Sequence, residues 1–536
     1  TQFNKYLTLN AGAIYSKRIK SYPYVTQSAY DQWYYLYRWS TYYPMGYDEN
    51  GNEFRSPASE FRQANTSKLE TNYTNINLGF HLDLTKDWTV DFDYTHANEE
   101  INWLRPGQRF TAADTWISPI ARKDANGNAV YVNSDGQVVS ATTQGAMQAY
   151  DLRNWTYTSI ATNPDNINRR STNTQSNTIN AYTTYNLNLG DLNKFKFMLG
   201  MNRVSYVREY HQAQRKELLN FENVQFGGSA GEQTVEGGKY WEAQIGFFGR
   251  INYDYQGKYL LEVNGRYDGT SRFLRNQRWS FFPSFSAGWN VAQENFWEPY
   301  RDYVSTFKIR GSWGELGNQN TKNWYPLYTI IDYKTNEGNW VLGESRPNVA
   351  GIPALISTTY GWETVRSWNA GLDVTALKNR LNFTFDYFVR ATYGMIGPAP
   401  ELPQTLGAAV PKTNNSNMES RGFEVMLSWK DKIGEDFRYG LTFTLADSRQ
   451  KILKYPNPSK SLGDKRDNWY EGRYDGDIWG YTTKGIAKTQ AEMDAHLAKV
   501  NQSQLGSNWS AGDIMYEDLN GDGKISNGKN TVDDSG

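Results

Sequence analysis

The stretch WEAQIGFFGRINYDY (241–255) alternates apolar and polar residues. Trp241, Ile245, Phe247 and Ile251 occupy odd positions, and the even positions carry Glu, Gln, Gly, Phe, Arg, Asn and Asp. After the turn QGK, the stretch YLLEVNGRYD (259–268) resumes the alternation. A period of two is the pleat of a β-strand. The two stretches therefore predict an antiparallel hairpin with one apolar face and one polar face.

The same alternation recurs along most of the chain. Examples are Ile76 to Leu82 and Leu381 to Val389, in which apolar residues occupy every second position. Turn residues separate these runs, as expected between strands. We predict about thirteen strands, near 4–16, 70–83, 87–97, 177–188, 195–208, 240–256, 259–268, 278–291, 304–314, 364–376, 380–393, 418–430 and 437–447.

Strand length indicates where the apolar face lies. In a soluble β-sandwich that face would be core, but sandwich strands usually have about 5 to 6 residues. A strand crossing a bilayer needs about 9 to 11 residues, and several of these are longer still. Aromatic rings edge them, as at Trp241, Tyr255, Tyr259 and Tyr267, which suits a membrane interface. The predicted fold is all-β, a transmembrane antiparallel β-barrel.

The connections between the predicted strands alternate in length. Five are tight: DLTKD, LGDLN, QGK, LKNR and DKIGED. Those on the other side are long, at 17–69, 98–176, 209–239, 315–363 and 394–417, and 269–277 is the exception. Outer-membrane barrels have short periplasmic turns and long extracellular loops. The pattern predicts an outer-membrane location in a Gram-negative bacterium.

Composition excludes several other classes. The chain carries 56 basic and 57 acidic residues, a balance that argues against nucleic acid as a partner. It has no cysteine, so neither a disulfide framework nor a thiolate zinc site is expected. Aromatic residues make up 15% of the chain, while the mean hydropathy is −0.74. No apolar run is long enough for a transmembrane helix.

The odd number of strands predicts that the sequence is one part of a larger barrel. Bacterial single-chain barrels close with an even number of strands, because an open edge in lipid leaves backbone groups unpaired. We expect residues 1–447 to form barrel strands with extracellular loops. Residues 448–536 should form a long extracellular connection with a short helix near 489–500. An N-terminal plug and the final strands are expected to be absent from this sequence.

Several long motifs carry a family resemblance. In order and spacing they resemble the barrel of SusC/RagA-type TonB-dependent transporters of Bacteroidetes, closely over the last half of the chain. These motifs are GRYDGTSRF (265–273), WSFFPSFSAGWNVAQENFW (279–297), FKIRGSWGELGNQN (307–320), SWNAGLDVTALKNRLNFTFDYFVRAT (367–392) and LPQTLGAAVPKTNNSNMESRGFEVMLSW (402–429).

The resemblance implies a 22-stranded barrel in outer-membrane lipid, with an N-terminal plug, opened by energy from the TonB system. It also implies a SusD-like lipoprotein lid outside and import of large nutrients, either oligosaccharides or peptides. Two other functions remain open from the residues alone. One is a passive porin or adhesin barrel, and the other is a soluble carbohydrate-binding or glycoside-cleaving β-protein.

The segment DLNGDGKIS (518–526) has the spacing of a calcium loop. Gly523 allows the sharp turn at the sixth position, but Lys529 stands where a bidentate glutamate is expected. Asp533 or Asp534 could replace that ligand. The alternative is a metal-free loop of Asx turns. The candidate ligands for a structural calcium ion are Asp518, Asn520, Asp522, Lys524 and Ser526.

An aromatic-rich connection (21–47) is the second candidate site. Exposed Tyr and Trp rings suit either stacking on sugar rings or contact with a protein lid, and packing of the loop on itself is the alternative. The candidate residues are Trp33, Tyr34, Tyr35, Tyr37 and Trp39.

No catalytic set is evident in the sequence. His81, His96, His211 and His496 fall on separate segments, without evident carboxylate or metal-ligand spacing. No carboxylates stand out as an acid and base pair. We therefore do not expect an enzyme.

Overall fold

The computed structural model describes most of the chain. The described residues are 4–24, 36–37, 39–48, 51–108, 111–115, 119–156, 165–321, 328, 331, 333–351, 353, 355–357, 359–399 and 410–535.

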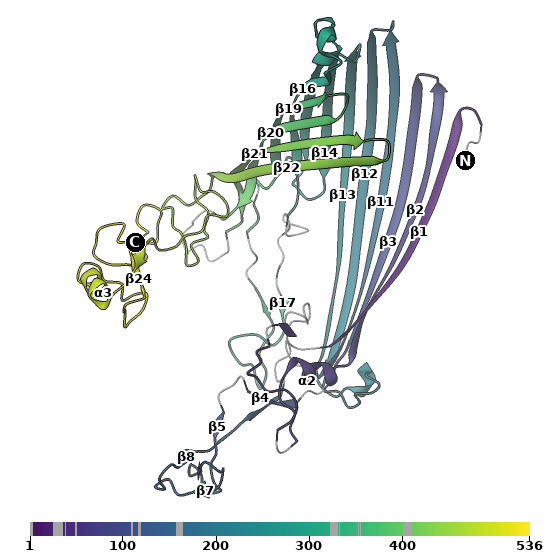
Figure 1. The fold of residues 1–536 in the computed structure, drawn as a ribbon. Helices are drawn as coiled ribbons and strands as arrows, with labels where there is room; N and C mark the ends of the chain where they lie inside the picture. The colour runs from purple at the N-terminus through teal and green to yellow at the C-terminus, as the bar shows by residue number, and fades with distance from the viewer. Residues whose placement is uncertain are drawn as a thin grey trace.

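Thirteen long strands form one antiparallel sheet, and their order in the sheet follows their order in the chain. The sheet curves into an open wall with β1 at one edge and β22 at the other (Figure 1). The strands are β1 (Leu7–Pro23), β2 (Thr66–Thr85), β3 (Trp88–Pro106), β11 (Asn166–Leu189), β12 (Asn193–Lys216), β13 (Gln233–Tyr255), β14 (Tyr259–Thr270), β15 (Trp279–Asn290), β16 (Val304–Asn318), β19 (Glu363–Ala376), β20 (Leu381–Gly397), β21 (Thr413–Ile433) and β22 (Phe437–Lys454).

All thirteen predicted strands are confirmed in place and order, but several are longer at the long-loop end. β11 begins at Asn166 rather than 177, and β12 ends at Lys216 rather than 208. β22 ends at Lys454, beyond the boundary placed at 447. The physical reason is that NINRRSTNTQS (166–176) is polar on both faces, so no period of two marks it.

The extra length changes where the wall ends. β11 and β12 have 24 residues each, or about 80 Å at about 3.3 Å per residue. Even with the tilt of about 40° usual in barrels, this exceeds the 40–45 Å or so of a bilayer with its headgroups. The long-loop end of the wall therefore stands clear of the membrane.

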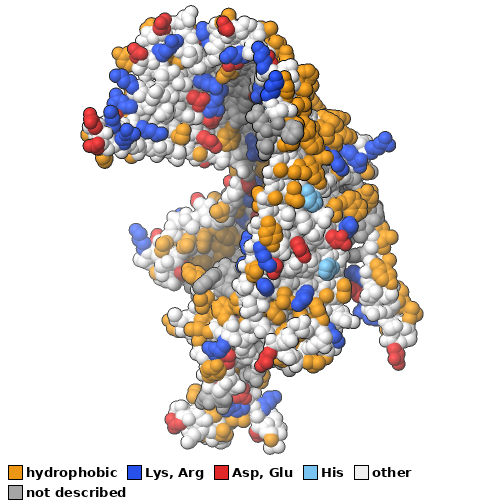
Figure 2. Space-filling view, turned by 90° about the vertical axis from the view of Figure 1, so that its right-hand side faces the viewer, with side chains coloured by type: hydrophobic (Ala, Val, Ile, Leu, Met, Phe, Trp, Pro, Cys, Tyr) orange, Lys and Arg blue, Asp and Glu red, His pale blue; other side chains and the backbone are white. Residues whose placement is uncertain are grey.

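The two faces of the wall differ in chemistry. The convex face exposes large apolar side chains, including Val263 at 56% and Phe281 at 57% exposure. Aromatic rings edge this band, and Tyr259 and Trp289 stack across neighbouring strands with centroids 6.4 Å apart. Figure 2 shows hydrophobic side chains gathered over much of the upper right of the molecule. The band matches the lipid-facing surface of a membrane barrel, whose strands place polar residues on the opposite, concave face. We call the concave face the lumen face.

The turn QGK shows how the tight connections form. Gln256 and Gly257 both have positive φ, at 56° and 68°, as in the type I′ turns that match strand twist. The Gly257 amide donates to Asp254 Oδ1 at 2.6 Å. The register then pairs Tyr255 with Tyr259. The turn thus aligns the apolar faces of both strands, which confirms the predicted hairpin.

Smaller elements lie outside the sheet. On the long-loop side, helix α2 (Pro57–Arg62) lies near β4 (Thr111–Asp114) and β10 (Arg153–Thr156). Two small sheets of short strands extend away from the wall (Figure 1). They are β5 (Ile120–Ala121) with β9 (Tyr150–Asp151), and β6 (Tyr131–Val132) with β7 (Val138–Val139) and β8 (Met147–Gln148). β17 (Tyr333–Lys334) pairs with β18 (Val349–Ala350).

Residues beyond β22 form a small unit with its own core. It contains β23 (Thr483–Ile486), β24 (Ile514–Tyr516) and helix α3 (Gln490–Leu497), which confirms the predicted short helix. Thr489 caps the helix by accepting from the Glu492 amide at 3.2 Å. Met493 of this helix packs together with Ala487 and Met515. Within the described part of the chain, no helix is long and apolar enough to span a membrane.

Candidate functional site

The lumen face is hollowed near the short-turn end. The hollow has a volume of about 810 Å³. Its lining combines acidic, basic and neutral polar side chains, among them Glu262, Ser286, Lys308, Arg310 and Asn369. Such a surface suits a water-filled interior.

Arg310 links three strands at this hollow. From β16, its guanidinium donates to Asp386 on β20 at 2.5 and 2.6 Å, and to Asp373 on β19 at 3.0 Å. Gly371 lies between Arg310 and Asp386 in the register. A Cβ at position 371 would meet Arg310 Cζ at 2.5 Å, so glycine leaves the space that the arginine crosses.

A row of rings and guanidinium groups crosses the lumen face near the long loops. We call it the mouth strip, and it consists of Tyr22, Tyr24, Trp103, Arg105, Arg170, Tyr210 and Tyr240. These residues extend from the end of β1 across β3, β11 and β12 to β13. Trp103 and Arg170 are direct register partners, so the strip is continuous between its two halves.

The contacts of the first half hold Arg105 between two rings. Its guanidinium lies 4.0 Å from the Tyr24 ring centroid and 4.9 Å from that of Trp103. The Trp103 indole donates to the Tyr22 hydroxyl at 2.7 Å. Tyr24 is buried, and its hydroxyl accepts from Asn166 Nδ2 at 3.2 Å. Stacking of this kind orients a guanidinium without neutralising its charge.

The second half repeats the arrangement. The Arg170 guanidinium lies 4.4 Å from the Tyr210 ring centroid. Tyr210 stacks in turn on Tyr240, with centroids 6.1 Å apart and planes 4° from parallel. Among the described residues, neither Arg105 nor Arg170 forms an ion pair.

The mouth strip is the functional feature that sequence reasoning missed. Trp103, Arg105 and Arg170 fell in the predicted loop 98–176. The structure places all three on strands, facing the lumen. No hydrophobic alternation marks these strand ends, and the only sequence signal is the tryptophan two residues before an arginine in WLR (103–105).

The long loops are anchored by buried charges. Arg55 Nη1 donates to Asp114 Oδ2 at 2.9 Å, and Arg55 also lies 3.6 Å from Glu60. All three residues are buried. This network connects the segment before α2 to β4, and so holds two long loops together.

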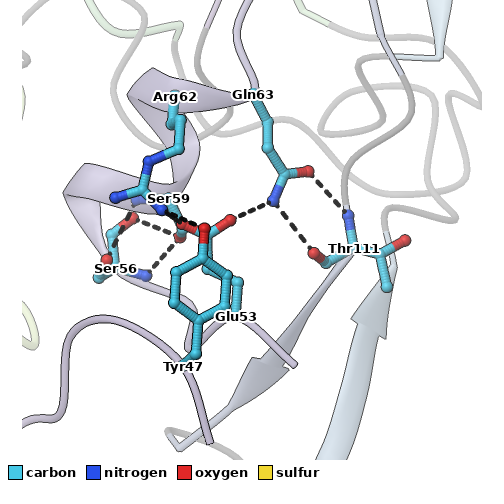
Figure 3. A network of polar contacts seen from close by, with 7 residues as sticks. All are labelled: Tyr47, Glu53, Ser56, Ser59, Arg62, Gln63 and Thr111. Carbon is cyan, nitrogen blue, oxygen red and sulfur yellow. Dashed lines mark hydrogen bonds and ion pairs between the residues drawn. The ribbon is translucent and has the colours of Figure 1, made fainter. Parts of the chain in front are cut away.

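A second network surrounds helix α2 (Figure 3). Arg62 donates to Tyr47 at 2.8 Å and to Glu53 at 2.5 Å. Gln63 donates to Glu53 at 3.0 Å and to the Thr111 carbonyl at 3.2 Å. At the other end of the helix, Ser56 and Ser59 form a reciprocal cap.

The predicted aromatic site lies only partly within the described residues. Trp33, Tyr34 and Tyr35 fall outside them. Tyr37 is 86% exposed, and the Trp39 ring lies 5.3 Å from that of Tyr43. The contact role of all five residues stays a prediction.

The calcium-like loop folds as a series of Asx turns. Asp518 accepts from the amides of Gly521 at 2.8 Å and Gly523 at 2.7 Å. Asp522 accepts from the Lys524 amide at 2.8 Å. Gly523 has a φ of +77°, which confirms the sharp turn at that position. Asn520 donates to Asp534 at 3.4 Å, which brings one proposed substitute ligand to the loop.

The other predicted ligands lie within the same turn. Lys524 directly follows Gly523 in the loop, and Ser526 Oγ accepts from the Gly528 amide at 3.0 Å. The carboxylate and carbonyl oxygens are of the type that calcium prefers, and each carboxylate oxygen keeps a further lone pair. The donor types therefore suit a calcium ion, while their arrangement around one and its binding stay predictions.

His81 differs from the sequence expectation. It lies 2.7 Å from Asp91 Oδ1 and 3.3 Å from Asp83 Oδ1, whereas no carboxylate partner was evident in the sequence. The register pairs His81 directly with Asp91. Among the described residues, no group of three or more His, Cys, Asp or Glu side chains is arranged to hold a metal ion.

Comparison with known proteins agrees with the fold. Residues 7–534 match the family model described as "TonB dependent receptor-like, beta-barrel". The chain is 27% identical over 369 residues to TonB-dependent receptor P3 of Formosa agariphila, covering 67% of this chain and 35% of that protein. It is also 27% identical over 339 residues to TonB-dependent receptor SusC of Bacteroides thetaiotaomicron, covering 62% of this chain and 30% of SusC.

Solved structures share the architecture. The RagAB peptide importer in its open-open state superposes with a TM-score of 0.66 at 16% identity, covering 97% of this chain and 52% of that one. The chain thus spans about a third of the length of the curated relatives and about half of the RagAB chain. Given the family match across nearly all of its length, the chain belongs to the TonB-dependent receptor β-barrel family, whose members are transporters of the Gram-negative outer membrane and not enzymes.

Proposed function

We propose that the protein imports large nutrients, oligosaccharides or peptides, across the outer membrane with energy from the TonB system. The observation that carries the proposal is the family match over residues 7–534. SusC and the RagAB peptide importer both resemble the chain, and the second is named for peptide transport. The coupling to TonB and the plug that it would move follow from the family resemblance.

The wall is consistent with a large cargo. Its lumen face is polar along its length, and the hollow near the short turns measures about 810 Å³. The long-loop end rises beyond the bilayer and carries the mouth strip. A cargo would therefore meet protein side chains before it reached membrane depth.

We further propose a SusD-like lipoprotein lid as the partner on the long-loop side. Support comes from the RagAB structures, whose family relationship suggests a lid of this kind. Tyr37, with its exposed ring, and Trp39 are the described members of the aromatic loop that would contact the cargo or the lid. Trp33, Tyr34 and Tyr35 complete the proposed set.

A structural calcium ion is proposed for the loop 518–526. Asp518, Asn520 and Asp522 would supply side-chain oxygens, the Lys524 carbonyl would follow, and Ser526 would act through water. The support is the spacing of these donors and the position of Asp534 near Asn520. The ion would fix the loop in one conformation.

Gentle detergent extraction of the native outer membrane tests this function. An affinity tag on this polypeptide would recover the intact protein together with whatever stays bound. We expect a longer polypeptide with a plug segment, accompanied by a lipoprotein. A polypeptide without a plug that comes alone would instead indicate a passive porin or adhesin, and one that needs no detergent would indicate a soluble β-protein.

A further inference from the structure

We propose that the mouth strip binds an acidic saccharide, with Arg105 and Arg170 holding its carboxylate or sulfate groups and the neighbouring rings lying against its sugar faces. The proposal rests on the import function and names its cargo class. Three features of the strip support it: the orientation of the arginines, the charge around them, and the position of the strip within the sheet.

The two arginines are held with their charge unsatisfied by carboxylates. Arg105 lies against Tyr24 and Trp103, and Arg170 lies against Tyr210. All three rings are half-buried or buried, so they give the guanidinium planes a fixed support. A guanidinium presents a rigid fork of donors that matches a carboxylate or another anionic oxygen pair. The two guanidinium groups are thus already oriented to bind an anionic group of this kind.

The lumen face around the strip carries an excess of positive charge. By strand alternation, Arg18, Lys20 and Arg208 face the same way as the strip arginines. The described carboxylates on that face and at that height that form no ion pair with a described residue are Glu99 and Glu236, while Glu242 is paired with Arg272 at 2.5 Å and Glu232 with Lys216. Five cations therefore face two acidic groups. A surface of this sign attracts anions and raises their local concentration.

The position of the strip favours a saccharide over a peptide. Sheets commonly bind extended peptides at an exposed edge, where free backbone groups add a strand. The β3–β13 part of the strip lies inside the sheet, with both neighbours of β11 and β12 hydrogen-bonded. In that part of the strip a ligand can be recognised only by side chains, which are aromatic rings and arginine guanidinium groups. Flat rings with polar tips suit the faces of sugars, and the cations suit acidic substituents.

The opposite face provides a matched control. Arg169 precedes Arg170, is exposed, and points to the convex side because side chains alternate along β11. Replacing either arginine by glutamine removes one positive charge from the same strand. A difference between the two variants would therefore report which face binds the ligand.

The test is isothermal titration of the purified full-length protein in detergent. The three ligands are an oligogalacturonate of about eight sugars, a neutral maltooligosaccharide of equal length, and an oligoglutamate peptide of equal charge. We expect the oligogalacturonate to bind in preference to the other two. We expect Arg170→Gln to weaken its binding at least about tenfold, the loss typical of one charge-assisted hydrogen bond. Arg169→Gln should stay within about twofold. Arg170→Lys keeps the charge without the fork, and should bind with intermediate affinity.

Equal binding of the neutral saccharide, preference for the peptide, or equal loss in both glutamine variants would overturn the proposal. Binding in detergent needs neither TonB nor a membrane gradient. A failure here would therefore leave the import function standing, and a failure of energised uptake would leave this binding result standing.

Discussion

Arg310 on β16 reaches Asp386 on β20 by crossing above Gly371, with two nitrogen–oxygen distances of 2.5 and 2.6 Å. Gly371 belongs to β19, the strand between them. A bidentate pair of this kind fixes the relative position of three strands at the hollow. The relationship depends on the absence of a side chain at position 371.

The replacement Gly371→Ala should therefore displace Arg310. Its Cβ would lie 2.5 Å from Arg310 Cζ, so the guanidinium must move away from Asp386. Because the ion pair is partly exposed, we expect the free energy of unfolding to fall by only about 1 kcal/mol. Urea titration of the refolded barrel measures this change. Gly311→Ala is the control, since its nearest atom would be the Asn369 carbonyl oxygen at 3.7 Å. Equal effects of both variants would contradict the account.

A charge on the convex face should be far more destabilising than one in the lumen. Val263 is 56% exposed in the middle of the apolar band. Val263→Arg should lower the free energy of unfolding in lipid by about 2 to 4 kcal/mol. Ser286→Arg, which faces the hollow, should have a much smaller effect. The comparison uses folding titrations into lipid vesicles, and a reversed order of the two variants would mean that the faces are wrongly assigned.

The buried pair of Arg55 and Asp114 should control the order of the long loops. Asp114→Ala would leave Arg55 buried beside Glu60 with one partner fewer. Removing one partner of a buried ion pair usually costs about 3 to 5 kcal/mol of stability. Here we expect that cost to make local opening of the loops easier. Limited proteolysis should then cut near α2 much faster. Asp151→Ala breaks the exposed pair with Arg122, in which both side chains are about half exposed, and should leave the cleavage rate unchanged.

Acid should weaken the turn that follows β15. There the pKa of Glu294 is lowered, first by a hydrogen bond from the Tyr259 hydroxyl and then by those from Trp289 and Lys258. A carboxylate whose pKa is lowered in the folded state adds stability above its unfolded pKa of about 4.3. That stability is lost as pH falls through the folded pKa.

The free energy of unfolding should consequently fall less steeply below about pH 4.3 in Glu294→Gln than in the wild type. Unfolding titrations between about pH 6 and pH 3 measure the slope. Glu435→Gln is the matched variant, because it removes one carboxylate from another tight turn on the same side of the wall. Parallel curves for wild type and Glu294→Gln would show that the turn does not depend on this carboxylate.

The sequence predicted the membrane part of the wall because lipid imposes a visible pattern there. Every second residue must be apolar there, as at Ile251 and Val263. The tight turn between these two strands fixes their register. Beyond the bilayer, water lies on both faces and that constraint ends. The strand end 166–176 therefore has the polar composition of a loop. The mouth strip, which includes part of this strand end, is not predicted from the sequence for the same reason.

Contacts across strands were harder to predict than the strands themselves. The pairing of His81 with Asp91 follows once the register of β2 and β3 is known. The space above Gly371 depends instead on the rotamer of Arg310, two strands away from Asp386. The calcium-like loop was recognised by its spacing, which is local in the chain. Local patterns were thus predictable, whereas long side chains reaching over a neighbouring strand were not.

Uptake by living cells tests energised import through this protein. Cells with the full-length protein would be given fluorescent oligosaccharide and peptide mixtures, with TonB present or deleted. Cargo should enter the periplasm only when TonB is present, while surface binding should persist without it. Uptake at the same rate in both strains would contradict energised import and indicate a passive pore.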